Sequence, residues 1–154
     1  MGIVNLGVSL KVGSPLNRSV MVFALVLFST LTYFCEGAFA QETSSRYGMG
    51  GRTGQFGEIR QQIAVSGQPF KIEGHCQSAC TMFLKLKNAC VDPGAELLFH
   101  AGSNQKATQQ MLSSYNGALR NYLVANHIMD TTTFTTISGR DIIQKFGYRS
   151  CAGK

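Results

Sequence analysis

An apolar segment near the N-terminus limits which part of this chain can fold into a domain. Residues 20–28 are all apolar, Lys11 and Arg18 precede them, and Ala38-Phe39-Ala40 is followed by a polar stretch. A basic flank, an apolar segment and an A-x-A site are typical of a secretory signal peptide. We therefore predict that residues 1–40 are a signal peptide and that residues 41–154 form a single periplasmic or secreted domain.

Residues 1–40 permit two other interpretations. A membrane-spanning helix needs roughly 20 apolar residues, and the run at residues 20–28 is shorter. Cys35 is compatible with a lipoprotein signal, but bulky residues precede it and the A-x-A site competes with it. We expect no stable membrane anchor after cleavage.

Cleavage would leave four cysteines, Cys76, Cys80, Cys90 and Cys151. An even number of cysteines in a small exported domain predicts two disulfide bonds, and the sequence permits three pairings. His75, Cys76 and Cys80 could instead be half of a zinc site. A second compact pair of ligands is missing, so we expect neither a metal nor a cofactor.

The charge of the exported part restricts its partners only weakly. Two of the 14 basic residues and one of the 8 acidic residues precede position 41, which leaves 12 against 7 and a net charge of +5. A nucleic-acid-binding surface typically has clustered basic residues interleaved with aromatic residues. The basic residues of this chain are scattered and show no such interleaving. We expect no nucleic-acid partner.

The hydrophobic pattern after residue 48 alternates between helical and strand-like segments. Phe56, Ile59 and Ile63 fall on one helical face, and Ser66-Gly67 ends that helix. The further expected elements are a strand at residues 69–74, a helix at 79–87, a strand at 95–100, a long helix at 111–123 and a last helix at 138–146. This alternation predicts an α/β fold with a short, mostly parallel sheet flanked by helices.

Ser78 lies in the sequence GHCQSACT, where the expected strand gives way to a helix. A nucleophile at a helix N-terminus has the N–H group of the next residue, Ala79, as an oxyanion donor. The G-x-S-x-G elbow has the same strand–turn–helix arrangement, although cysteines replace both glycines here. The alternative is a helix-capping serine. A serine nucleophile needs an adjacent base, and His100 at the end of the second strand is the best candidate.

Residues 74–84 and 90–100 resemble the proteolytic subunit of the Clp protease and its wider serine-hydrolase (Clp/crotonase) superfamily. They are also similar to small exported bacterial proteins with the same C-x-S-A-C pattern. The resemblance implies a Ser78 nucleophile, a His100 base and an Asp130 orienting acid. The alternatives are that Asp141 is the acid or that no acid takes part. The resemblance further implies an oxyanion hole made by the N–H groups of Ala79 and one member of a glycine pair, Gly50 or Gly51, and a strand at residues 147–149 after the last helix.

Only residues 41–49 precede this glycine pair, so the resemblance implies a small, truncated form of the Clp/crotonase-like fold. The expected function is that of an exported serine hydrolase that cleaves a peptide or acyl substrate. The alternative is a catalytically inactive, disulfide-stapled binding module of the same fold. The sequence leaves open whether the chain forms an oligomer.

Overall fold

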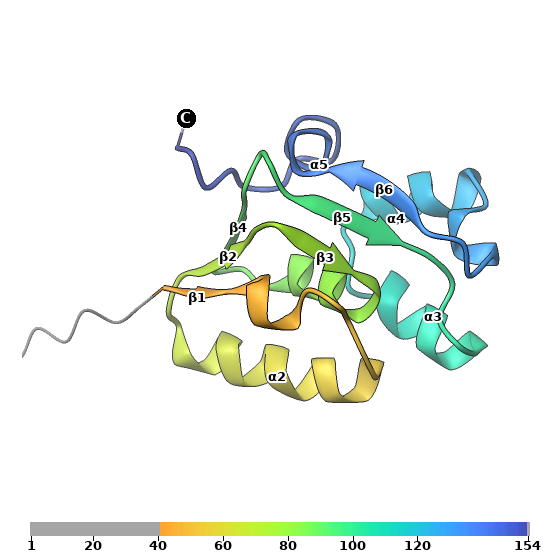
Figure 1. Cartoon of the computed structure of the whole chain (residues 1–154), viewed down its shortest axis with the longest axis horizontal. Coiled ribbons are helices and arrows are strands. Elements are labelled where there is room, and N and C mark those ends of the chain that lie inside the picture. Colours follow the sequence, from red (N-terminus) through yellow and green to blue (C-terminus); the bar gives the residue numbers. More distant parts are fainter. Residues whose placement is uncertain (1–40, 154) are drawn as a thin grey trace, which may run out of the picture. The chain divides into compact units, whose positions relative to one another are not determined.

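The computed structural model describes residues 41–153, which form a mixed α/β fold (Figure 1). The predicted signal peptide, residues 1–40, lies outside the described residues and stays a prediction. The strands are β1 (Glu42–Thr43), β2 (Phe70–Ile72), β3 (His75–Gln77), β4 (Ala89–Val91), β5 (Glu96–Phe99) and β6 (Thr135–Ser138). The α-helices are α2 (Thr53–Ser66), α3 (Gln105–Leu112), α4 (Gly117–Ala125) and α5 (Gly139–Phe146), and the 3₁₀ helices are η2 (Ser44–Tyr47), η3 (Ser78–Lys85) and η4 (Ile128–Asp130).

The strands form two three-stranded sheets. The first has the order β1-β2-β4 and is entirely parallel. The second has the order β3-β5-β6, with β3 parallel and β6 antiparallel to β5. The expectation of an α/β fold with mostly parallel strand pairs is confirmed.

The two sheets meet at a kink, because β2 runs on into β3 and β4 runs on into β5 (Figure 1). Gly74 has a φ of +59°, a left-handed conformation that glycine adopts without steric cost. Hydrogen bonds from Asp92 N to Ile72 O and from Glu96 N to Gly74 O, both 2.8 Å long, hold the strand pairs together across the kink. The sequence pattern merged β3 into the turn after β2 and therefore did not predict this second strand.

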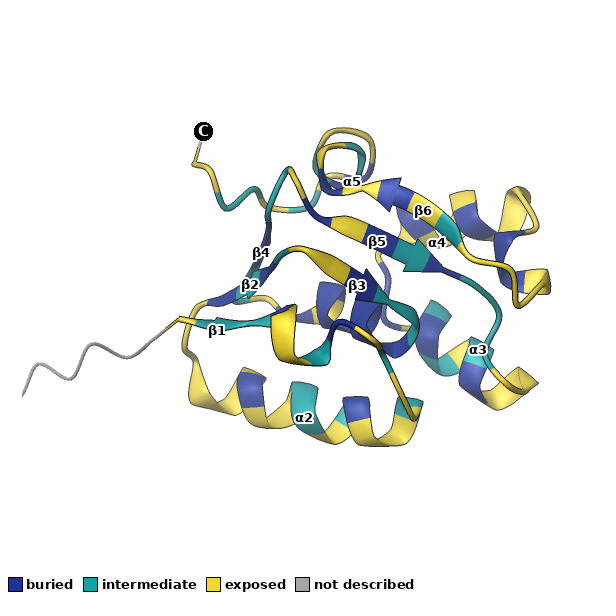
Figure 2. Cartoon of the chain, in the orientation of Figure 1, coloured by how far each residue is buried: buried dark blue, intermediate teal, exposed yellow. Residues whose placement is uncertain are grey.

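The hydrophobic core lies between the kinked sheets and the helices (Figure 2). Phe56 and Ile63 of α2 are buried, as their spacing predicted. Phe70 and Phe83 are fully buried, with ring centroids 4.8 Å apart. Full burial of such a side chain contributes about 1.5–3 kcal/mol to the free energy of unfolding.

The prediction of one long helix at residues 111–123 is wrong, because the chain breaks between α3 and α4. The hydroxyls of Ser113 and Ser114 donate to the carbonyl of Gln110, and the side chain of Asn116 caps α4 by accepting from Leu119 N. These local bonds compete with helix continuation. Tyr115 between the helices is buried, and its hydroxyl lies 2.7 Å from Thr81 Oγ1.

The C-terminal segment also departs from expectation. The last helix was predicted correctly, since the Ser138 hydroxyl accepts from Asp141 N and Gly147 ends α5 in a left-handed conformation. The strand that the family resemblance implies at residues 147–149 is not formed. Residues 149–151 instead pair with Val91 through a single parallel bridge and two backbone hydrogen bonds.

Two disulfide bonds are present, as expected, and they join Cys76 to Cys80 and Cys90 to Cys151. Disulfide bonds persist mainly in oxidising compartments, so the pairing favours a location outside the cytoplasm. Within residues 41–153, no helix combines the length and apolar character needed to cross a membrane.

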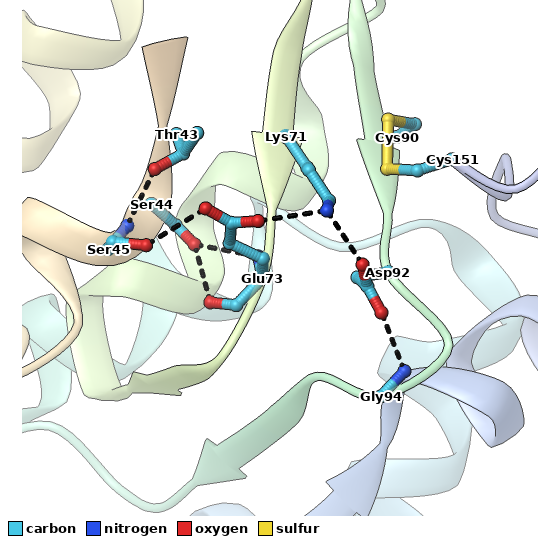
Figure 3. A network of polar contacts seen from close by, with 9 residues as sticks. All are labelled: Thr43, Ser44, Ser45, Lys71, Glu73, Cys90, Asp92, Gly94 and Cys151. Atoms are coloured by element: carbon cyan, nitrogen blue, oxygen red, sulfur yellow. Dashed lines mark hydrogen bonds and ion pairs between the residues drawn. A yellow bond between two sulfur atoms is a disulfide. The ribbon is translucent and has the colours of Figure 1, made fainter. Parts of the chain in front are cut away.

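Beside the Cys90–Cys151 bond, the first sheet carries a group of charges that we call the Lys71 network (Lys71, Glu73 and Asp92; Figure 3). Lys71 Nζ lies 2.8 Å from Asp92 Oδ2 and 2.9 Å from Glu73 Oε2. The pKa of Lys71 is raised to about 12. The hydrogen bond to Asp92 is the largest cause, and the hydrogen bond to Glu73 is the second largest. Gly94 N donates to Asp92, and Ser45 donates to Glu73, so each charged group has partners.

Candidate functional site

Ser78 joins β3 to η3 in a strained backbone conformation. Its φ is +56°, and His127 is the only other residue besides glycines with a positive φ among those that the structure describes. Such a conformation in a residue other than glycine costs about 1–3 kcal/mol and persists only where surrounding structure enforces it. The Ser78 hydroxyl makes no hydrogen bond within residues 41–153, and η3 has no side-chain cap. The interpretation of Ser78 as a helix cap is therefore wrong.

The Cys76–Cys80 bond holds the turn that contains Ser78. Cys76 lies on β3, Cys80 lies in η3, and both side chains are fully buried. Thr81 Oγ1 also donates to the carbonyl of Ser78 over 2.7 Å. Anchors on both sides of Ser78 explain how the chain retains the unfavourable φ.

Gly50 packs directly against this turn. A Cβ atom at Gly50 would lie 2.6 Å from Gln77 O and 2.9 Å from Ser78 Cβ, and the φ of Gly50 is +71°. Only glycine fits both restrictions. The N–H group of Gly50 donates to Tyr47 O over 2.9 Å, so it is not free to bind an oxyanion. Of the two predicted glycine donors, Gly51 is the one that remains, and the role of Gly50 is to let the backbone approach Ser78.

His100 follows β5, which pairs in parallel with β3. Ser78 and His100 therefore both follow the carboxyl ends of adjacent parallel strands, where α/β proteins bind ligands. The two ring nitrogens of His100 are buried and make no hydrogen bond within the described residues. Phe134 packs on the ring, with centroids 4.4 Å apart.

Burial lowers the pKa of His100 below its ordinary value of 6.5. A contact with the backbone of Ala101 acts in the opposite direction, but it does not meet the geometry of a hydrogen bond. Buried polar groups are nearly always paired, so an imidazole with two unpaired nitrogens is a candidate functional group. The lowered pKa favours the neutral ring, which is the form that accepts a proton.

The hydrogen bonds expected within a Ser78–His100–Asp130 triad are absent from this structure. His100 bonds to neither partner, and Asp130 Oδ2 instead lies 2.7 Å from His127 Nδ1 on the surface. The backbone beside Asp130 is nevertheless tied to that beside His100, because Ala101 N donates to Thr131 O over 2.7 Å. The rival acid, Asp141, pairs with Lys145 on α5.

A cavity of about 840 Å³, which we call the Ser78 pocket, opens beside Ser78, His100 and Gly51. The fully buried Ala79 follows Ser78 and is not part of the pocket wall. Arg52, Asn104 and Lys106 also line the pocket, and the sequence patterns did not identify them. Asn104 had a detectable signal as the cap of α3, where its side chain accepts from Ala107 N.

The site belongs to a disulfide-bonded, mixed α/β protein in which a strained serine and an unpaired histidine face one pocket. No protein-family model matches the chain, and no curated protein is significantly similar to it in sequence. The resemblance to the Clp/crotonase superfamily therefore stays a proposal.

Proposed function

We propose that this protein is a serine hydrolase that is exported to the periplasm or the medium and cleaves a peptide or acyl bond. The observation that carries the proposal is that Ser78, held at a φ of +56°, lines one pocket with a histidine whose two ring nitrogens have no hydrogen-bond partner among residues 41–153. In the proposed reaction Ser78 Oγ attacks the carbonyl carbon, and His100 takes the serine proton and delivers it to the leaving group. Water then hydrolyses the acyl-serine.

The oxyanion formed in this reaction needs hydrogen-bond donors. The proposed donors are the N–H groups of Gly51, on the pocket wall, and of Ala79, at the start of η3, where N–H groups lack partners within the helix. Hydrogen bonds between catalytic groups are often long or poorly aligned without substrate, so a missing bond between Ser78 and His100 is compatible with the reaction. The proposal requires His100 to turn toward Ser78 when substrate binds.

Asp130 is the proposed orienting acid, and it would have to leave His127 for His100. This assignment rests on the backbone bond between Ala101 and Thr131, which brings the two segments together. Asp130→Asn should lower kcat by several orders of magnitude, as loss of the correct histidine tautomer does in other triads. His127→Gln should leave kcat unchanged or raise it. Loss of activity in Asp141→Asn but not in Asp130→Asn would transfer the role to Asp141.

A fluorophosphonate probe tests the proposal on the purified protein. Attack by Ser78 Oγ forms an oxygen–phosphorus bond and expels fluoride, so labelling should add the phosphonyl mass to the peptide that contains Ser78. Ser78→Ala should abolish labelling, while Ser103→Ala, on the rim of the same pocket, should preserve it. Absence of Ser78 labelling under conditions that label a known serine hydrolase would refute the proposal.

A non-catalytic binding module is the second candidate function. The observation that favours it is the absence of both triad hydrogen bonds, with Asp130 engaged by His127. In that case the Ser78 pocket would bind a ligand without turnover, and the phosphonate probe would leave Ser78 unmodified.

A further inference from the structure

The walls of the Ser78 pocket carry an excess of positive charge. Arg52 precedes α2 and Lys106 lies in the first turn of α3, and both line the cavity. Glu58 is the only carboxylate among the described residues that line it. Neither Arg52 nor Lys106 forms an ion pair within residues 41–153. Two cations without protein partners therefore face the same space as Ser78.

The start of α2 adds to this positive potential. Arg52 occupies the capping position of this 14-residue helix without a side-chain capping bond, and the first turn contains no acidic residue. The Thr53 hydroxyl donates to Gln110 Oε1 instead. Unpaired N–H groups at a helix N-terminus attract anions, and here residues of this first turn line the same pocket as the two cationic side chains.

The remaining walls define the size and character of an occupant. Ala107 and Met111 of α3 supply an apolar surface, and the volume of about 840 Å³ lies within the range of small-molecule sites. An arginine fork fits a carboxylate with two parallel hydrogen bonds. A short acyl chain that ends in a carboxylate matches both surfaces.

We propose that the Ser78 pocket selects anionic acyl substrates, in which a carboxylate bound by Arg52 and Lys106 accompanies the bond that Ser78 attacks. This inference rests on the proposed hydrolase function and adds the substrate class to it. Selectivity arises because the two cations and the start of α2 attract the carboxylate in the bound state.

The test compares two 4-nitrophenyl esters of the same chain length, the monoester of adipate and the ester of hexanoate, with the rate of Ser78→Ala subtracted. We expect kcat/KM to favour the anionic ester by about tenfold, the combined size of two partly exposed ion pairs and a helix dipole. The double variant Arg52→Gln/Lys106→Gln should abolish this preference by lowering kcat/KM for the adipate monoester toward that for the hexanoate ester. Lys87→Gln/Arg140→Gln, which removes the same charge outside the pocket, should keep the preference.

The outcomes separate this inference from the proposed function. Turnover of both esters at equal rates, dependent on Ser78, overturns the anionic selectivity and leaves the hydrolase. Without turnover that depends on Ser78 the hydrolase proposal fails, and NMR titration with adipate then decides the anion site. Shifts of the Thr53 and Gly54 amide signals that disappear in Arg52→Gln/Lys106→Gln support the site, and no shift in the unmodified protein overturns it.

Discussion

The Lys71 network lies where the strands kink, whereas the Ser78 pocket lies at the carboxyl ends of β3 and β5, and the two regions differ in how completely their polar groups are paired. Lys71, Glu73 and Asp92 each have close partners beside a disulfide bond (Figure 3). The ring nitrogens of His100 have none within the described part of the chain, and Ser78 is held in an unfavourable backbone conformation. Since folding favours paired polar groups and relaxed backbone, the first region is explained by stability alone. Stability does not explain the unpaired histidine and the strained serine of the second region, so we infer that this region has a function.

The largest effect should come from removing the proposed nucleophile, Ser78, or the proposed base, His100. Ser78→Ala and His100→Ala should each lower kcat by about 10⁴-fold or more, and the double variant should be no worse, because groups that act as a unit are not additive. Ester turnover after subtraction of the uncatalysed rate measures this. His75→Gln, a change of an exposed histidine, serves as the control. Additive losses in the double variant would show that the two residues act separately.

The two disulfide bonds should differ in what their removal affects. Loop-closure entropy predicts a loss of about 4 kcal/mol for Cys90→Ala/Cys151→Ala, which opens a sequence separation of 61, and about 2 kcal/mol for Cys76→Ala/Cys80→Ala, with a separation of 4. Denaturant unfolding measures both. Turnover at low temperature should fall more in the second variant, because that bond holds the turn with Ser78. A larger loss of turnover in Cys90→Ala/Cys151→Ala would contradict the division between a structural region around the Lys71 network and a functional region around Ser78.

Gly50→Ala should lower kcat by about 100- to 1000-fold, comparable with the loss of an oxyanion donor. The added methyl group would collide with Gln77 O and displace the turn that carries Ser78. Gly57→Ala is the matched control, since a Cβ there meets nothing within 4 Å. Alanine in the interior of α2 should stabilise the protein by about 0.5–1 kcal/mol. Full activity of Gly50→Ala would refute the close approach to Ser78.

The pH dependence of kcat/KM should report the protonation of the His100 ring. Since burial lowers its pKa below 6.5, the neutral base persists as the pH falls through 6.5, and kcat/KM should decline only at lower pH. The unfolded state binds the proton more readily, so the contribution of His100 to stability rises with pH across the same interval. A pH–rate profile measures the first effect. An acidic midpoint above 6.5 would contradict the burial of His100.

The smallest effect should follow Lys71→Met. The hydrogen bonds from Lys71 are the main cause that lowers the pKa of Glu73 and of Asp92. Their stabilisation is present above the unfolded pKa of about 4 and is lost as the pH falls through the lower folded values. The variant should raise both carboxyl pKa values, as followed by NMR, without altering turnover. A large loss of turnover would show that the two regions are coupled.

The sequence predicted those features that depend on local patterns. The face of α2, the glycine that ends it and the Ser138 cap of α5 all have signals within a few residues. The break at residues 113–116 was missed, because the hydrophobic spacing continues through it while serine and asparagine side chains redirect the backbone. The bridge at Ser150 depends on pairing with Val91, which is distant in sequence.

The same limit applies to the site. Ser78 and His100 were identified because each sits where a strand ends, and both line the pocket. Asp130 has the right place in the order of the chain, but its side-chain partner, His127, could not be inferred from spacing. Arg52 and Lys106 line the same pocket only because α2 and α3 fold together. No local sequence motif therefore identifies them as site residues.

The Cys90–Cys151 bond closes the chain into a covalent ring with a tail. His100 and Asp130 lie in the ring, whereas Ser78 and the glycine pair lie in the tail. A protease that cut the exposed residues 131–134 would leave both fragments joined by the disulfide bond, and the nicked protein, heavier only by the one water molecule added in hydrolysis, would separate into fragments after reduction. A cut in the exposed residues after α2 would release the fragment that carries Gly50 and Gly51 as a separate chain. Resistance to fragmentation is therefore unequal along the molecule, because a single cut within the ring leaves His100 covalently attached, whereas a single cut after α2 detaches the glycine pair.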